Sequence, residues 1–221
     1  MIAIVAALPR EIAGLVRGVR AERTLLARGV HLHQLEKAIV VAAGMGSTRA
    51  AIAVEAALAA GEVTELISAG LAGACSDALR PGAVCEATVV IDARTGERYE
   101  TGAAGGTVLV TGTAIAGVRE KARLAASYGA GMVDMEAATV ARLALAHGLA
   151  FRAIKGISDA HDFEMASLAR FAGDNGHFRT RAFAVHTALR PHRWGAAMKL
   201  GRASTRALRA LHEVLGGLAR G

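Results

Sequence analysis

The stretch of residues 133–162, VDMEAATVARLALAHGLAFRAIKGISDAHD, decides the fold of this chain. Residues 135–147 carry small or apolar side chains on nearly every face, which is typical of a helix buried in a layered α/β protein. The apolar run 149–157 predicts a strand, which Arg152 and Lys155 interrupt. The stretch therefore predicts a strand end, a buried helix, a second strand and an acidic loop.

Two acidic residues stand at the edges of this unit. Glu136 opens the predicted helix, and Asp159 follows the predicted strand. Ligands of open parallel sheets bind beyond the carboxyl ends of the strands, so we expect both acids near a ligand. Each acid alone also has a structural explanation. A Glu in the first helical turn is favoured by the helix dipole, and Asp159 after Ser158 can cap a following helix.

The pattern VDMEAATVARLA…FRAIKGISDAHD resembles the purine nucleoside phosphorylase and nucleosidase superfamily. It is most similar to methylthioadenosine/adenosylhomocysteine nucleosidases and related phosphorylases. The resemblance implies that Met135 and Glu136 contact the ribose, and that Asp159, next to Ser158 in the substrate site, protonates the purine leaving group. It also implies a single three-layer αβα domain with a central mixed, twisted β-sheet over residues 1–189. Residues 190–221 are then a basic amphipathic helical extension.

A third acid follows the first predicted strand. Residues 1–8 read as a buried strand, and Pro9 suits the first turn of a helix over residues 10–20. The order Ala-Leu-Pro-Arg-Glu-Ile resembles the nucleosidases, in which a Glu at the place of Glu11 activates the attacking water. The alternative is an ordinary acid in a first helical turn.

Two glycine-rich segments follow predicted strands. Gly44 and Gly46 precede a helix that Ser47 or Thr48 could cap, and N–H groups at such a helix start attract anions or hydroxyls. The segment from Gly70 to Gly73 resembles the family's Gly-x-x-Gly turn, so the four glycines are candidate substrate-binding positions. The chain departs from the family here. Leu71 and Ala72 stand where the family has hydroxyl residues, and Ser68 stands where uridine phosphorylases have an arginine.

The segments expected to cover the base also depart from the family. The covering segment is short and polar over residues 92–100. The nucleosidases place an aromatic residue near Ile115, which can pack on a base but cannot stack as a ring does. Phe163 or Phe171 is the alternative aromatic face, although Phe171 also reads as core.

Length and composition fit one globular α/β domain. The chain has 221 residues, 53% of them hydrophobic. No run reaches the length of a membrane span, and the N-terminus lacks a basic region before its apolar run, so a cytoplasmic protein without a secretory signal is expected. Cys75 and Cys85 match no metal or redox motif and are expected as free thiols. No histidine cluster has metal-ligand spacing, so no metal or cofactor is expected, and phosphate is a candidate co-substrate.

The basic charge is concentrated at the C-terminal end. After residue 189 there are seven basic residues and one acidic residue, so most of the net charge of +7 lies there. That distribution argues against general nucleic-acid binding. Residues 195–218 predict a helix with a leucine face, which either packs on the domain with a solvated basic face or lies on an anionic membrane surface beside Trp194.

Together these features predict an enzyme that cleaves the N-ribosidic bond of an adenine-type nucleoside, with water or phosphate as nucleophile. The segment FAVHTALRPHRW is also similar to hopanoid-associated phosphorylases, which act on an adenosyl group attached to a lipid. A short covering segment and a basic helix suit such a substrate and membrane association. The alternative is a non-catalytic nucleoside-binding protein on the same fold. The resemblance further implies a homo-oligomer.

Overall fold

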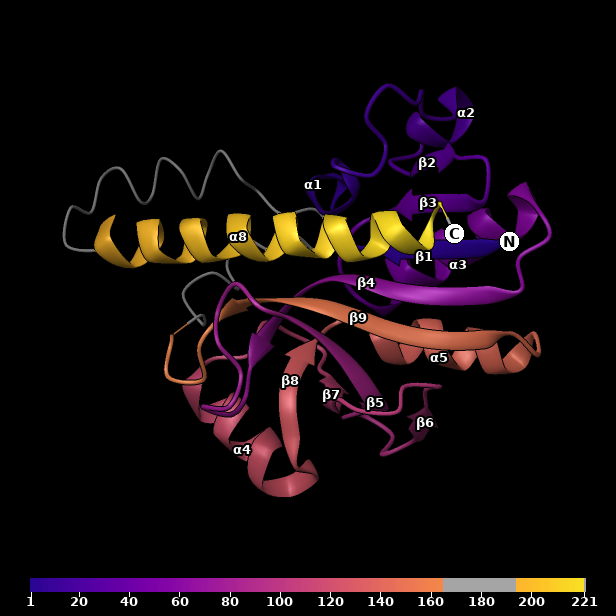
Figure 1. Cartoon of the computed structure of the whole chain (residues 1–221). Helices are drawn as coiled ribbons and strands as arrows, with labels where there is room; N and C mark the ends of the chain where they lie inside the picture. The colour runs from indigo at the N-terminus through magenta and orange to yellow at the C-terminus, as the bar shows by residue number, and fades with distance from the viewer. Residues whose placement is uncertain (165–193, 221) are drawn as a thin grey trace.

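A computed structural model describes residues 1–164 and 194–220, and Figure 1 shows how their elements are arranged. Within these residues nine strands form one sheet. The strands are β1 (Ile2–Ala6), β2 (His31–Gln34), β3 (Ala38–Ala42), β4 (Glu65–Ala74), β5 (Val84–Asp92), β6 (Arg98–Glu100), β7 (Thr107–Thr111), β8 (Ala130–Asp134) and β9 (Ala150–Asp159). The helices are α1 (Pro9–Ile12), α2 (Arg23–Leu26), α3 (Ser47–Ala60), α4 (Val118–Tyr128), α5 (Ala137–Ala146) and α8 (Trp194–Leu218).

The sheet is mixed, as the sequence predicts. Its order is β2-β3-β1-β4-β8-β7-β5-β6, and β9 pairs with both β4 and β5. β9 runs parallel to β4 and antiparallel to β5, while β4 meets β8 in antiparallel pairing. Because β7 joins β8 to β5, the strands β4, β8, β7, β5 and β9 close a ring of pairings. Register places Gly73 of β4 opposite both Asp159 of β9 and Val133 of β8.

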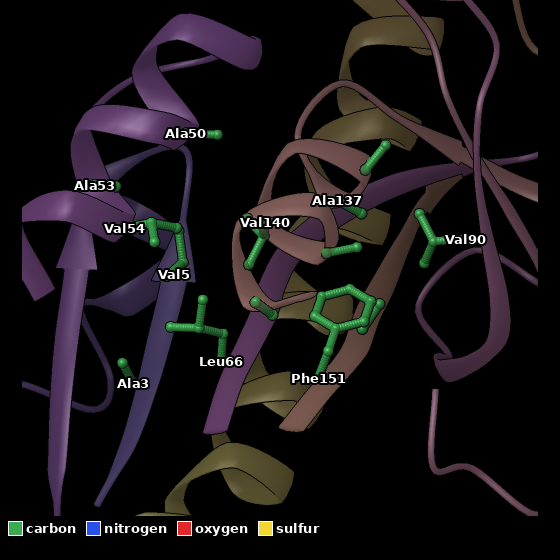
Figure 2. Packing of buried hydrophobic residues seen from close by; sticks show 14 of the residues in the cluster. Ala3, Val5, Ala50, Ala53, Val54, Leu66, Val90, Ala137, Val140 and Phe151 are labelled. Atoms are coloured by element: carbon green, nitrogen blue, oxygen red, sulfur yellow. The ribbon is translucent and has the colours of Figure 1, made fainter. Parts of the chain in front are cut away.

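Two helical layers enclose the sheet. One buried cluster joins it to α3 and α5, where Val54 and Val140 pack toward Leu66 and Phe151 (Figure 2). A second cluster joins the opposite face to α1 and α8. In Figure 1, α8 runs along β4 and β9, and α5 lies on the other side of these strands. The predicted three-layer α/β domain is therefore confirmed.

The C-terminal helix belongs to the core of this domain. Leu211 and Leu215 are fully buried, in one cluster with Ile4 of β1. Close packing is possible because residue 156 of β9 is glycine, where a Cβ atom would stand 3.1 Å from the Cβ of Ala207. The predicted helix over residues 195–218 is confirmed. The predicted domain boundary at residues 189 and 190 lies outside the described residues, as does Phe171.

Some predicted boundaries are wrong. The helix expected over residues 10–20 ends at Ile12, and the residues that follow form turns in which Gly18 has a left-handed φ of 78°. The Gly70–Gly73 segment is not a turn but the last part of β4. The β2–β3 hairpin starts at His31, after the short helix α2.

Among the described helices, none combines the length and apolar character needed to cross a bilayer. Both cysteines are free, with Cys75 buried and Cys85 partly exposed. The short segment of residues 92–100 forms the turn and edge strand of the β5–β6 hairpin.

Candidate active site

A cavity of about 550 Å³ lies at the carboxyl ends of the strands. Its polar walls come from the ends of β1, β4, β8 and β9, as expected for an α/β sheet. Glu11, Glu136 and Asp159 all line it, together with Met135 and Ser158. The two carboxylates that the sequence places in separate segments thus reach one pocket, and Glu11 joins them there.

Glu11 is buried at the start of the short α1 helix and accepts three backbone hydrogen bonds. Oε2 accepts from the N–H groups of Ala7 at 3.0 Å and Leu8 at 2.9 Å, and Oε1 accepts from that of Leu71 at 3.2 Å. Gly70 makes this approach possible: its φ is 122°, and a Cβ atom there would stand 2.9 Å from Oε2. These contacts fix Glu11 against the end of β4 with its carboxylate at the cavity.

Glu136 stands between β8 and α5 as the N-cap residue of that helix. Its Oε1 atom accepts a hydrogen bond from the Gly46 N–H at 2.8 Å. Burial is the main cause that raises the pKa of Glu136 to about 7, and the carboxylate of Asp134 raises it further. The Lys155 ammonium and the Gly46 N–H oppose this shift. The carboxyl of Glu136 therefore changes charge near neutral pH.

A buried polar network lies beneath Glu136. The Lys155 ammonium contacts Asp134 Oδ2 at 2.8 Å and donates to Ser68 Oγ at 2.9 Å. Asp134 Oδ1 accepts from the Thr111 hydroxyl at 2.7 Å, and its Oδ2 accepts from the Ala137 N–H at 3.0 Å. The network thus ties four strands to the start of α5 and holds the segment that carries Glu136.

Asp159 ends β9 and is buried in a second ion pair. Its Oδ2 atom contacts the ammonium of Lys121 from α4, and its Oδ1 atom contacts the Ser158 hydroxyl. Lys121 also donates to the carbonyl oxygens of Ala160 at 2.8 Å and Phe163 at 3.2 Å. Residue 73 is glycine, and a Cβ atom there would come within 3.2 Å of Asp159 Oδ2. The charged pair is therefore packed tightly against the end of β4.

The predicted glycines divide into two groups. Gly73 lines the cavity, whereas Gly44, Gly46 and Gly70 lie outside the lining. Gly46 acts through its bond to Glu136, and it is also the N-cap of α3, so neither Ser47 nor Thr48 caps that helix. Ile115 lines the cavity as predicted. Among the described residues, neither Phe163 nor any residue of 92–100 does so.

Three residues of the site escaped the sequence analysis: Lys121, Asp134 and Lys155. The sequence does indicate Lys155, because a lysine inside an apolar strand needs a buried partner. The sequence does not indicate Lys121, since this residue stands among other charged residues in a helix whose buried face is not evident from sequence. The N-terminal half of α8 was also missed as a wall of the cavity, to which it contributes Ala197, Leu200, Gly201, Ser204, Thr205 and Leu208.

The fold and a pocket lined by several carboxyl groups at the strand ends are typical of an α/β enzyme whose active site lies at the carboxyl edge of its sheet. A family model described as the phosphorylase superfamily matches residues 1–110 and 95–189. The chain belongs to this superfamily. The membership confirms the predicted enzyme class, which acts on N-ribosyl bonds. A comparison with curated protein sequences finds no match.

Solved structures share the fold at low sequence identity. Native futalosine hydrolase of Helicobacter pylori is 17% identical with a TM-score of 0.71, covering 97% of this chain and 94% of its own. Methylthioadenosine nucleosidase of Arabidopsis thaliana is 16% identical with a TM-score of 0.69, covering 96% and 91%. A putative methylthioadenosine/adenosylhomocysteine nucleosidase of Borrelia burgdorferi, bound to adenine, is 14% identical with a TM-score of 0.70, covering 100% and 99%. At such identities the likeness shows the fold alone.

Proposed function

We propose that this protein cleaves the N-ribosidic bond of an adenine-type purine nucleoside. The observation that carries the proposal is the convergence of Glu11, Glu136 and Asp159 on one cavity, where Met135 and Ser158 also stand. Cleavage of this bond develops positive charge on the ribose and negative charge on the base. A pocket that offers a carboxylate to the sugar and a proton donor to the base stabilises both changes.

Each acid has a proposed task in the reaction. The bond between ribose C1′ and the base nitrogen breaks, its electron pair moves to the base, and Asp159 supplies a proton to the base. Glu136 accepts hydrogen bonds from ribose hydroxyls and stabilises the adjacent cation. The oxygen of the nucleophile bonds to C1′, and Glu11 takes up the proton when that nucleophile is water.

Water is the nucleophile that the lining of the cavity favours. Glu11 and Glu136 line it and would repel a phosphate dianion when ionised, whereas Lys155 balances the charge of Asp134. Arg10 also lines the cavity and is the feature that favours phosphate as co-substrate. Product analysis separates the two reactions, because hydrolysis yields free ribose and phosphorolysis yields ribose 1-phosphate at a rate that depends on phosphate.

The experiment is a panel of adenosine and its 5′-substituted derivatives, incubated with and without phosphate. Adenine release is expected, and Asp159→Asn should lower it about 100-fold or more, on the scale of general acid catalysis. Asp162→Asn is the matched control, since Asp162 is exposed three residues further along. Nucleoside binding without adenine release over long incubation would instead support the non-catalytic alternative, which the apolar Leu71 and Ile115 favour.

The apolar wall of the cavity supports a finer proposal about the substrate. Leu200 and Leu208 of α8 line the cavity, and they would suit an apolar 5′ substituent such as the lipid of an adenosyl hopanoid. In the panel, kcat/KM should then rise with the length of an aliphatic 5′ substituent. Equal values for short and long substituents would contradict a lipid-linked substrate.

Membrane-surface contact and self-association are two further proposals. Trp194 and Met198 are exposed beside the basic Lys199 and Arg202, on the half of α8 that also lines the cavity. Such a surface suits anionic lipid, so the protein should sediment with anionic vesicles at low salt and not with neutral ones. A homo-oligomer, expected from the family resemblance, should be evident as a multiple of the chain mass in light scattering.

A further inference from the structure

Lys121 is the buried cation at the end of the cavity where Asp159 stands. Its side chain is 1% exposed, although it lines the cavity together with the acid. An ammonium has three N–H donors, and all three have acceptors: Asp159 Oδ2, the Ala160 carbonyl and the Phe163 carbonyl. With every donor occupied, Lys121 has none left for a nucleoside. It can act on the reaction only through Asp159 and the turn that follows.

The other oxygen of Asp159 has a partner that tolerates either protonation state. The Ser158 Oγ atom contacts both Asp159 Oδ1 and the carbonyl oxygen of Ala72, the latter at 3.1 Å. When Asp159 is ionised, the Ser158 hydroxyl donates to Oδ1. When Oδ1 carries a proton, the Ser158 hydroxyl donates to Ala72 instead, which leaves the O–H of Oδ1 free to be donated to the base. In both states Oδ2 accepts from Lys121, so a proton on Asp159 belongs on Oδ1.

We propose that Lys121 is a positioning residue for the leaving-group proton, holding Oδ2 of Asp159 so that the transferable proton resides on Oδ1, and setting the pH range in which that proton is present. This inference rests on the proposed function of Asp159 as the acid. During base release the O–H bond at Oδ1 breaks, the N–H bond of the base forms, and the resulting carboxylate returns to full pairing with the ammonium.

Among the described residues, other titratable groups stand near this pair: Glu120 lies next to Lys121 in α4, and His161 and Asp162 are exposed just after Asp159. The Cys75 thiol faces the pair from the end of β4, and burial raises its pKa to about 12, so it stays uncharged near neutral pH. Arg10, Glu11, Asp134 and Glu136 line other parts of the cavity. Lys121 is thus the only one of these groups in direct contact with the Asp159 carboxyl.

Two substitutions distinguish a role of Lys121 in positioning Asp159 from a general role in the stability of the fold. Lys121→Gln removes the charge and keeps a side-chain donor, whereas Lys121→Arg keeps the charge. An adjacent cation favours the ionised form of a carboxyl group, typically by one to three pH units. The alkaline limb of kcat should therefore move to higher pH in Lys121→Gln. Its kcat should also fall roughly tenfold to a hundredfold at the optimum with little change in KM, because the acid is misplaced.

Lys121→Arg should keep the alkaline limb of the wild-type profile, even if its kcat falls. Arg119→Gln, an exposed change in the same helix, should reproduce both the wild-type kcat and the profile. A Lys121→Gln profile that superimposes on the wild type overturns the inference, and so does a rise in KM at unchanged kcat. Should Lys121→Gln fail to fold, a shifted alkaline limb in Lys121→Arg overturns it, and an unshifted limb supports it.

A readout without turnover keeps the two proposals apart. Carbon-13 NMR of labelled aspartate follows the Asp159 carboxyl directly, with Asp159→Asn to assign the signal. Its titration should move to higher pH in Lys121→Gln whether or not a given nucleoside is cleaved. Absence of adenine release from every nucleoside by the wild type would defeat the proposed function, whereas an unmoved titration in an active enzyme would defeat only the role of Lys121.

Discussion

At the scale of single residues, the Glu136 carboxyl couples folding to pH. Its pKa is raised from 4.5 to about 7 in the folded chain, mainly by burial. The folded state therefore holds this proton more tightly than the unfolded state does. The resulting stability is fully present below pH 4.5 and is lost as the pH rises through about 7.

Glu136→Gln should remove this dependence, because the amide does not titrate. Urea unfolding of the variant should show a smaller fall in the free energy of unfolding between pH 4.5 and pH 8 than that of the wild type. Glu55→Gln, at an exposed position of α3, is the control and should keep the wild-type slope. Parallel slopes in the wild type and Glu136→Gln would show that Glu136 does not titrate abnormally.

The same scale shows what the sequence could and could not predict. Glu136 and Asp159 were found because each stands in a distinctive local sequence at the end of a strand. Their partners come from elsewhere in the chain: Lys121 precedes Asp159 by 38 residues, and Gly46 precedes Glu136 by 90. Pairing across such separations depends on strand order and helix placement, which local patterns do not specify.

At the scale of elements, substitutions in α8 can test whether the C-terminal helix contributes to the stability of the domain. Leu211→Ala should lower the free energy of unfolding by about 2–5 kcal/mol, because it leaves a cavity in the cluster that α8 shares with β1. Val214→Ala is the matched control, since Val214 is 43% exposed and its loss should have little effect. Equal and small effects in chemical denaturation would show that α8 docks only loosely.

Because α8 is part of the core, the activity of a chain shortened after residue 189 cannot by itself test membrane contact. Removal of the segment after residue 189 takes away Leu211, Leu215 and the cavity wall at once. Loss of activity in such a chain would therefore follow from damage to the core and would say nothing about lipid. Surface changes such as Lys199→Glu and Arg202→Glu leave the buried face of α8 intact and test membrane contact directly.

Short elements were the least predictable. A helix over residues 10–20 was expected from its apolar spacing, yet α1 spans only Pro9–Ile12. Within that stretch α8 provides the packing instead, since His212 Nε2 lies 2.8 Å from the Glu11 carbonyl oxygen and the ring lies against Gly14. A tertiary contact with a distant helix thus replaces the local helix that periodicity predicted.

At the scale of the whole molecule, the Lys155–Asp134 pair joins β9 to β8, two strands that do not pair with each other in the sheet. Both side chains are 1% exposed. Lys155→Met should lower the free energy of unfolding by about 3–5 kcal/mol, because the carboxylate of Asp134 stays buried without its cation. Arg123→Met breaks the exposed pair with Glu120 and should leave the melting temperature nearly unchanged. Similar melting temperatures for the two variants would show that the buried pair is dispensable.

The layered α/β class was predictable at this scale, because strand and helix patterns alternate along the chain. The ring of pairings was not, since it depends on β9 reaching both β4 and β5. That closure brings the ends of β4, β8 and β9 to one place. It explains why residues from distant segments meet in a single pocket.

Gly156 allows α8 to pack closely on the sheet, and this close packing limits how far the pocket can change. A methyl group there would press on Ala207 and push α8 outward, and α8 is at once a core layer and a pocket wall. Mutations that widen the pocket for a bulkier ligand therefore loosen the same helix that shields the sheet from water. Compensating changes elsewhere in the second cluster would have to accompany any broadening of ligand preference, so a laboratory selection for new substrates should start from a stabilised parent.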